Sequence, residues 1–105
     1  MRQDDLSAKV TRLVEDELAA FAPAKEGDLM MLRDFARLRV RRPRPITVNF
    51  SGGFTQTCYS VTRSDGDYAV LFMPRAGYFS LCVDTLFGPA DIGVHGPALG
   101  CFASV

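Results

Sequence analysis

Residues 46–83, ITVNFSGGFTQTCYSVTRSDGDYAVLFMPRAGYFSLCV, determine the fold, because turn signals divide them into four runs rich in β-branched and aromatic residues. The turn signals are the Gly-Gly pair at 52–53, the Asp-Gly pair at 65–66 and the sequence PRAG at 74–77. Asp-Gly is the strongest of the three, since a type I′ turn needs positive φ at both central positions and these residues tolerate it. The stretch therefore predicts a four-stranded antiparallel β-meander.

The three turns also predict which residues face one another. A two-residue loop at the first turn pairs Val48 with Thr57, the second turn pairs Tyr59 with Phe72, and a four-residue third loop pairs Phe72 with Phe79. With these registers the apolar side chains share one face, whereas a slip of one residue at any turn would scatter them over both sides. This first face carries Ile46, Val48, Phe50, Tyr59, Val61, Tyr68, Val70, Phe72, Phe79, Leu81 and Val83.

The opposite face of the sheet is polar on its first two strands and apolar on its last two. A contiguous apolar patch usually marks a surface that is covered or that binds a partner. We expect the C-terminal segment to cover this face, or the face to mediate self-association as a homodimer. The predicted interface residues are Cys58, Leu71, Met73, Tyr78 and Cys82.

Two amphipathic helices are predicted before the sheet. Residues 4–22 place apolar side chains at intervals of three, four and one, which gives a single stripe. A shorter helix follows, from Asp28 to about Arg37. Residues 36–42 also alternate between apolar and basic side chains, as an edge strand does, so helix and strand both remain open there. Both helices are expected to cover the first face of the sheet.

The remaining segment, residues 84–105, is rich in Gly and Pro and is expected to be irregular, with short strands near 92–94 and 99–102. The chain has 105 residues, enough for a single domain with one core, in which 1–42 form a helical segment with a basic edge. The predicted fold class is α+β. It is a two-layer sandwich of two N-terminal helices on an antiparallel meander of four strands, or of five or six if the tail contributes.

Composition supports a folded chain, with 48% hydrophobic and 23% charged residues. The N-terminus has no apolar signal, and no stretch is long and apolar enough to span a membrane. We therefore expect a soluble cytoplasmic protein without a membrane partner.

Arginine is concentrated in residues 33–44, which hold six of them against one acidic residue, Asp34. Guanidinium groups pair with phosphates and carboxylates, so the segment could dock nucleic acid or an acidic protein. Nucleic-acid-binding domains are usually net basic, whereas this chain has a net charge of 0. Nucleic acid is therefore less favoured than a solvated edge that pairs partly with acidic residues of the first helix. The predicted basic patch is Arg37, Arg39, Arg41, Arg42 and Arg44.

An alternative is a small apolar ligand bound between helices and sheet. Cystatin-like and NTF2-like domains share a helix-on-meander architecture, in which a pocket often opens between the layers, but architecture alone says little about function. We expect such a pocket near Tyr59, Tyr68 and His95. It is the basis for the alternative of a ligand-binding or enzymatic domain.

The cysteines and the single histidine are the residues most able to carry chemistry, and their positions indicate structural roles. The three cysteines, Cys58, Cys82 and Cys101, form an odd number without a CxxC pair, so free thiols are expected. Their spacing from the single histidine, His95, is too wide for the close ligand pairs of a zinc site. Cys58 and Cys82 occupy strand positions that suit a small buried side chain. With no catalytic residue, metal or cofactor predicted, the leading hypothesis is a non-enzymatic protein-interaction or regulatory module.

Overall fold

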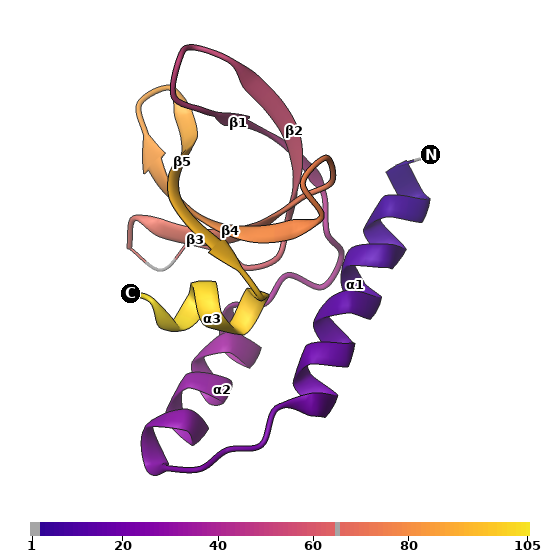
Figure 1. Ribbon diagram of the computed structural model, residues 1–105, viewed down its shortest axis with the longest axis vertical. Helices are drawn as coiled ribbons and strands as arrows, with labels where there is room; N and C mark the ends of the chain where they lie inside the picture. Colours follow the sequence, from indigo (N-terminus) through magenta and orange to yellow (C-terminus); the bar gives the residue numbers. More distant parts are fainter. Residues whose placement is uncertain (1–2, 65) are drawn as a thin grey trace.

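The computed structural model describes residues 3–64 and 66–105, in which helices pack against a five-stranded sheet. The elements are α1 (Gln3–Ala20), α2 (Glu26–Leu38), β1 (Pro45–Asn49), β2 (Thr55–Ser60), β3 (Tyr68–Met73), β4 (Tyr78–Thr85), β5 (Gly88–Gly96) and α3 (Ala98–Ala103). The sheet closes into a barrel in the order β1-β2-β3-β4-β5, because β5 also pairs with β1 (Figure 1). The predicted α+β class, with helices on a mostly antiparallel sheet, is confirmed, and the C-terminal segment supplies the fifth strand.

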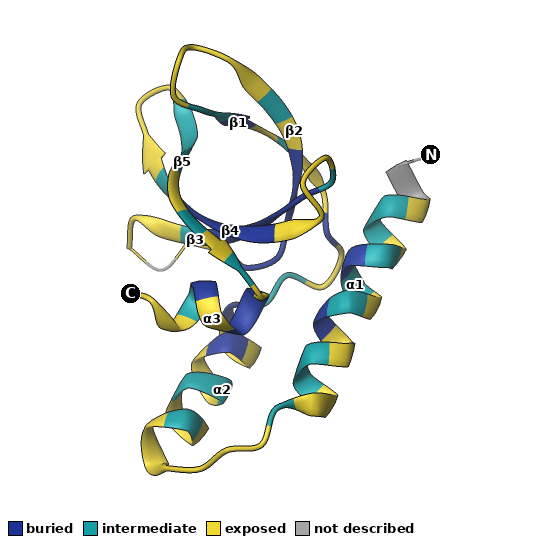
Figure 2. Cartoon of the chain, viewed as in Figure 1, coloured by how far each residue is buried: buried dark blue, intermediate teal, exposed yellow. Residues whose placement is uncertain are grey.

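The outer face of the barrel forms the main core with the helices. The predicted Asp-Gly turn includes residue 65, which lies outside the described residues. The predicted pairings across the second and third hairpins are confirmed for Tyr59 opposite Phe72 and for Phe72 opposite Phe79. These side chains belong to one buried cluster with Val10 of α1 and Phe35 of α2. In Figure 2 the buried turn of α2 lies next to α3, which fills the space between α2 and the barrel. The helices therefore cover the first face of the meander, as predicted.

The predicted register of the first hairpin is wrong by one residue. Val48 lies opposite Gln56 instead of Thr57, because the loop has three residues and not two. The backbone N–H of Phe50 donates to the carbonyl oxygen of Phe54 at 2.8 Å, which leaves 51–53 outside the ladder. Since side chains alternate across a strand, this single extra residue turns every β1 side chain to the other face of the sheet.

The reversal of β1 explains what covers the second face. Because the sheet closes on itself, that face becomes the interior of the barrel, and the buried β1 side chain of Val48 packs there against the apolar positions of the other strands. This interior cluster is Val48, Cys58, Leu71, Met73 and Cys82, with Ile46, Phe50 and Ala69 packed against it. Four of the five residues predicted to form a self-association surface are thus buried within one molecule, and Tyr78 alone of the five is exposed. This corrects the expectation that the face is open to a partner.

The C-terminal segment is more regular than predicted. The strand expected near 92–94 is part of β5, whereas the strand expected at 99–102 is wrong, because these residues belong to α3. The first amides of α3, those of Ala98 and Leu99, donate to the two carboxylate oxygens of Glu17 at 2.8 and 3.0 Å. A helix start needs acceptors for its free N–H groups, and here α1 supplies them from a distant part of the chain.

Residues 36–42 combine both predicted conformations. The helix α2 continues to Leu38, and Arg39 then forms a single antiparallel bridge with Thr62 after the end of β2. The backbone N–H of Val40 donates to the carbonyl oxygen of Val61 at 2.8 Å, which extends this short pairing.

Among the described residues, no helix is long and apolar enough to cross a membrane.

Candidate functional site

Four exposed arginines form a basic surface where α1 meets the segment between α2 and β1. They are Arg12, Arg41, Arg42 and Arg44. Two adjoining hollows, of about 610 and 530 Å³, are lined by these side chains together with Ser7, Ala8, Thr11, Val40 and Ser60. Both hollows include Arg41 and Arg42, so the basic surface is continuous across them.

The backbone that carries these arginines is fixed on two sides. Arg44 and Ser60 are joined twice: the Arg44 N–H donates to the Ser60 hydroxyl at 2.9 Å, and the Ser60 N–H donates to the Arg44 carbonyl at 2.9 Å. On the other side, the Ser7 hydroxyl donates to the carbonyl oxygen of Pro43 at 2.8 Å. The segment is therefore held between α1 and β2, and little backbone conformational freedom remains to be lost when a partner binds.

Ion pairs divide the predicted basic patch into two parts. Arg39 lies 2.8 Å from Glu15 of α1, which agrees with the expected pairing to acidic residues of the first helix, whereas Arg37 lies 3.6 Å from Asp34 of its own helix, α2. Among the side chains that the structure describes, no carboxylate lies within 4.0 Å of a guanidinium group of the basic surface. Within the part of the chain whose side chains are described, the charges on this surface are therefore without a neutralising ion pair.

Arg12 was not predicted as part of this site. It lies on α1, far from residues 33–44 in sequence, and joins Arg41 and Arg42 because α1 packs alongside their segment. Its position on the polar side of α1 was visible in the sequence, but its neighbours were not.

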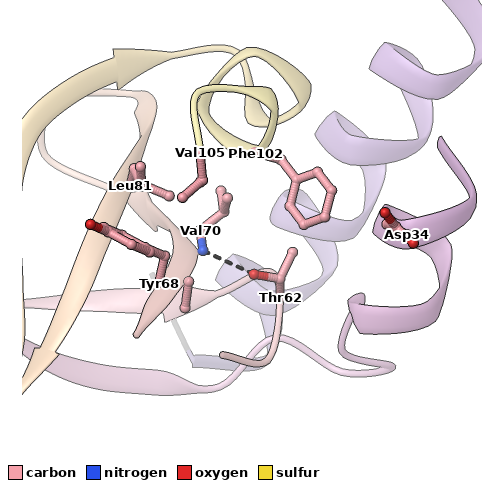
Figure 3. Close-up of a pocket in the computed structure, with 8 residues that line it drawn as sticks. Asp34, Thr62, Tyr68, Val70, Leu81, Phe102 and Val105 are labelled. Atoms are coloured by element: carbon pink, nitrogen blue, oxygen red, sulfur yellow. Dashed lines mark hydrogen bonds between the residues drawn. The ribbon is translucent and has the colours of Figure 1, made fainter. Parts of the chain in front are cut away.

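A separate pocket of about 280 Å³ opens between the helices and the sheet (Figure 3). It is lined by Asp34, Thr62, Tyr68, Ala69, Val70, Leu81, Phe102 and Val105. The Thr62 hydroxyl accepts a hydrogen bond from the backbone N–H of Val70 at 2.9 Å. This helix–sheet pocket thus combines an apolar floor with a few polar groups, as small-molecule sites do.

The three residues predicted to bind a ligand do not come together. Tyr68 lines the helix–sheet pocket, whereas Tyr59 is buried in the main core and His95 lies on β5. The His95 ring stacks on Tyr78, with their centroids 4.5 Å apart. The pocket expected between helices and sheet is present, but Tyr68 alone of the predicted set contributes to it.

A polar cluster on β4 and β5 joins Ser80, Asp91 and His95. The Asp91 carboxylate accepts a short hydrogen bond from the Ser80 hydroxyl and lies 3.0 and 3.1 Å from His95 Nε2. In a nucleophilic triad the imidazole lies beside the hydroxyl, whereas here the carboxylate separates the two. Because Ser80 is also fully buried, the arrangement favours a structural role.

The thiols are equally unsuited to nucleophilic attack. Burial, with a further contribution from the charge of Asp91, raises the pKa of Cys58 to about 11 and that of Cys82 to about 12. Burial and the charge of Glu17 raise the pKa of Cys101 to about 11. A nucleophilic cysteine needs a lowered pKa, so these three residues act as small core side chains.

Two further searches concern metal sites and similarity to known proteins. Within residues 3–64 and 66–105, no group of three His, Cys, Asp or Glu side chains is placed to hold a metal ion. Comparison with models of known protein families, with curated proteins and with solved structures finds no match for this chain.

Proposed function

We propose that this chain is a non-enzymatic protein-interaction module that binds an acidic segment of a partner protein through its basic surface. The proposal rests on the continuous surface formed by four exposed arginines, Arg12, Arg41, Arg42 and Arg44. Among the side chains that the structure describes, none of these guanidinium groups forms an ion pair with a carboxylate. Each planar guanidinium group can hold a carboxylate by two parallel hydrogen bonds.

The rigidity of the segment supports recognition of a defined partner. The hydrogen bond from the Val40 N–H to the Val61 carbonyl oxygen and that from the Ser7 hydroxyl to the Pro43 carbonyl oxygen fix the backbone on either side of Arg41 and Arg42. The two hollows give an extended acidic segment more than one place to seat a carboxylate. Such pairs contribute modestly one by one at an exposed site, so affinity depends on several acting together.

An acidic protein is a better match than nucleic acid for two reasons. The net charge is 0, so the protein lacks the long-range positive field that draws nucleic-acid-binding domains to a phosphate backbone. The hollows are lined by arginine, small polar and aliphatic residues, and no aromatic side chain among their lining residues offers a stacking platform for a base.

Two other functions considered for the sequence have less support. Self-association through the second face of the sheet loses its surface, because that face lies inside the closed barrel. A nucleophilic enzyme would need an accessible activated hydroxyl or thiol, whereas Ser80 and the thiols are buried.

Fluorescence anisotropy with a short glutamate-rich peptide tests the proposal. Arg41→Ala/Arg42→Ala should weaken peptide binding by about tenfold, which corresponds to about 1.4 kcal/mol for two guanidinium contacts. Arg33→Ala/Arg75→Ala removes the same charge from exposed arginines outside both hollows and should change binding little. Equal losses of peptide affinity in the two variants would mean that net charge alone explains the binding, and would overturn the proposal. Tighter binding of a matched single-stranded oligonucleotide than of the peptide would also overturn it.

A further inference from the structure

The helix–sheet pocket has one charged wall. Asp34 of α2 lines it opposite Tyr68, with Thr62 and Phe102 between them in the view of Figure 3. The carboxylate pairs with Arg37 at 3.6 Å, and both side chains are more than half exposed. An exposed ion pair at that distance contributes little, so Asp34 is available to a second cation.

Phe102 adds a second feature that suits a cation on the same side of the pocket. Its ring is held by an edge-to-face contact with Phe35, with centroids 5.3 Å apart and an interplanar angle of 86°. An aromatic face attracts a cation through its quadrupole, and attraction increases where water is partly excluded. A carboxylate and an oriented ring near one another favour an ammonium group.

The rest of the pocket is suited to an apolar body. Val70 and Leu81 form its floor, and both are buried, while Val105 and the ring of Tyr68 supply further apolar surface. Thr62 uses an oxygen lone pair for the Val70 amide, which leaves its hydroxyl hydrogen as a donor toward a ligand. The volume of about 280 Å³ is at the lower limit of ordinary ligand pockets, roughly 300 to 1,000 Å³.

We propose that the helix–sheet pocket binds a small amphipathic amine, with its ammonium group at Asp34 and Phe102 and its apolar part over Val70 and Leu81. This site is separate from the basic surface and does not depend on the function proposed for it. The charge of the site is opposite to that of the basic surface, so the two discriminate between ligands of opposite sign.

The test compares 2-phenylethylamine with 3-phenylpropanoate, which presents a similar apolar part with the opposite charge. Titration of the ¹⁵N-labelled protein by NMR should give shifts at Thr62, Tyr68 and Phe102 with the amine. The amine should bind at least about fivefold more tightly than the carboxylate, the ratio expected for one partly exposed ion pair.

Two variants separate a specific site from general attraction of cations. Asp34→Asn should abolish the preference for the amine, whereas Asp16→Asn removes an equal charge from an exposed position outside the pocket and should preserve it. Circular dichroism would establish that both variants are folded. The inference is overturned if the carboxylate binds as well as the amine, if the shifts lie elsewhere, or if Asp34→Asn retains the preference.

Discussion

The Ser7 hydroxyl donates a hydrogen bond of 2.8 Å to the carbonyl oxygen of Pro43, 36 residues further along the chain. This bond ties α1 to the segment that carries Arg41 and Arg42, and it lies at the edge of the hollow that Arg12 also lines. One serine therefore connects the packing of α1 to the geometry of the basic surface.

Ser7→Ala tests this connection. Loss of the bond should lower the free energy of unfolding by about 1 kcal/mol, because the Pro43 carbonyl is left with one acceptor site unfilled. It should also weaken binding of a glutamate-rich peptide, since the arginine segment becomes less ordered before binding. Urea unfolding and fluorescence anisotropy measure the two effects. Ala8 lines the same hollow without a side-chain bond, so Ala8→Ser is the matched control, and an identical response from both variants would contradict the role of the bond.

The contact between Glu17 and the first turn of α3 predicts a large effect from one carboxylate. Glu17→Ala removes both acceptors from the Ala98 and Leu99 amides and should cost about 2 kcal/mol in unfolding free energy, whereas Glu17→Gln should cost about 1 kcal/mol. Its exposed neighbour Asp16 is the control, for which Asp16→Asn should change stability by less than about 0.5 kcal/mol. Similar values for Asp16→Asn and Glu17→Ala would exclude a cap.

The three-residue loop between β1 and β2 predicts a difference between two glycines. Gly53 has φ of 83°, and an added Cβ would contact nothing within 4 Å, so Gly53→Ala incurs a purely conformational cost of about 1 kcal/mol. Gly27 lies inside α2 with equally open surroundings, and Gly27→Ala should raise stability by about 0.5 kcal/mol. Thermal or urea unfolding of both variants measures the difference, and changes of the same sign would refute the assigned loop conformation.

The raised thiol pKa values predict a loss of stability at alkaline pH. A thiol whose folded pKa exceeds its unfolded value of 9.0 binds its proton more tightly in the folded state, so its contribution is complete below pH 9. It then declines as pH rises toward about 12 for Cys82, by up to about 1.4 kcal/mol per pH unit. Urea unfolding from pH 8 to pH 11 should show a steeper decline for the native protein than for Cys82→Ala. Parallel curves would show that Cys82 ionises alike in the folded and unfolded protein.

The third hairpin was predictable from its turn sequence. PRAG at 74–77 gave a four-residue loop, and the pairing of Phe72 with Phe79 follows from it. The Gly-Gly pair at 52–53 tolerates positive φ in loops of either two or three residues, so local sequence could not decide the register of Val48. Burial of Val48 inside the barrel fits the longer loop, and that is a tertiary effect.

The residues of the candidate sites also fall into those that the sequence predicts and those that depend on the tertiary fold. Composition alone identified Arg41, Arg42 and Arg44, because their basic charge is concentrated in a short segment. The addition of Arg12 depends on α1 packing beside that segment, and the cap from Glu17 to Ala98 spans 81 residues. Contacts at such separations depend on the closed fold, which turn and periodicity signals do not describe.

The location of the partner site is tested most directly by NMR of the ¹⁵N-labelled protein titrated with a glutamate-rich peptide. The largest shifts should lie at the backbone amides and guanidinium Nε–H groups of Arg12, Arg41, Arg42 and Arg44. They should shrink when the ionic strength rises from about 0.01 M to about 1 M, since the Debye length falls from about 30 Å to about 3 Å. Shifts concentrated instead on the exposed β4–β5 turn at Leu86 and Phe87, or unaffected by salt, would contradict an acidic partner at the basic surface.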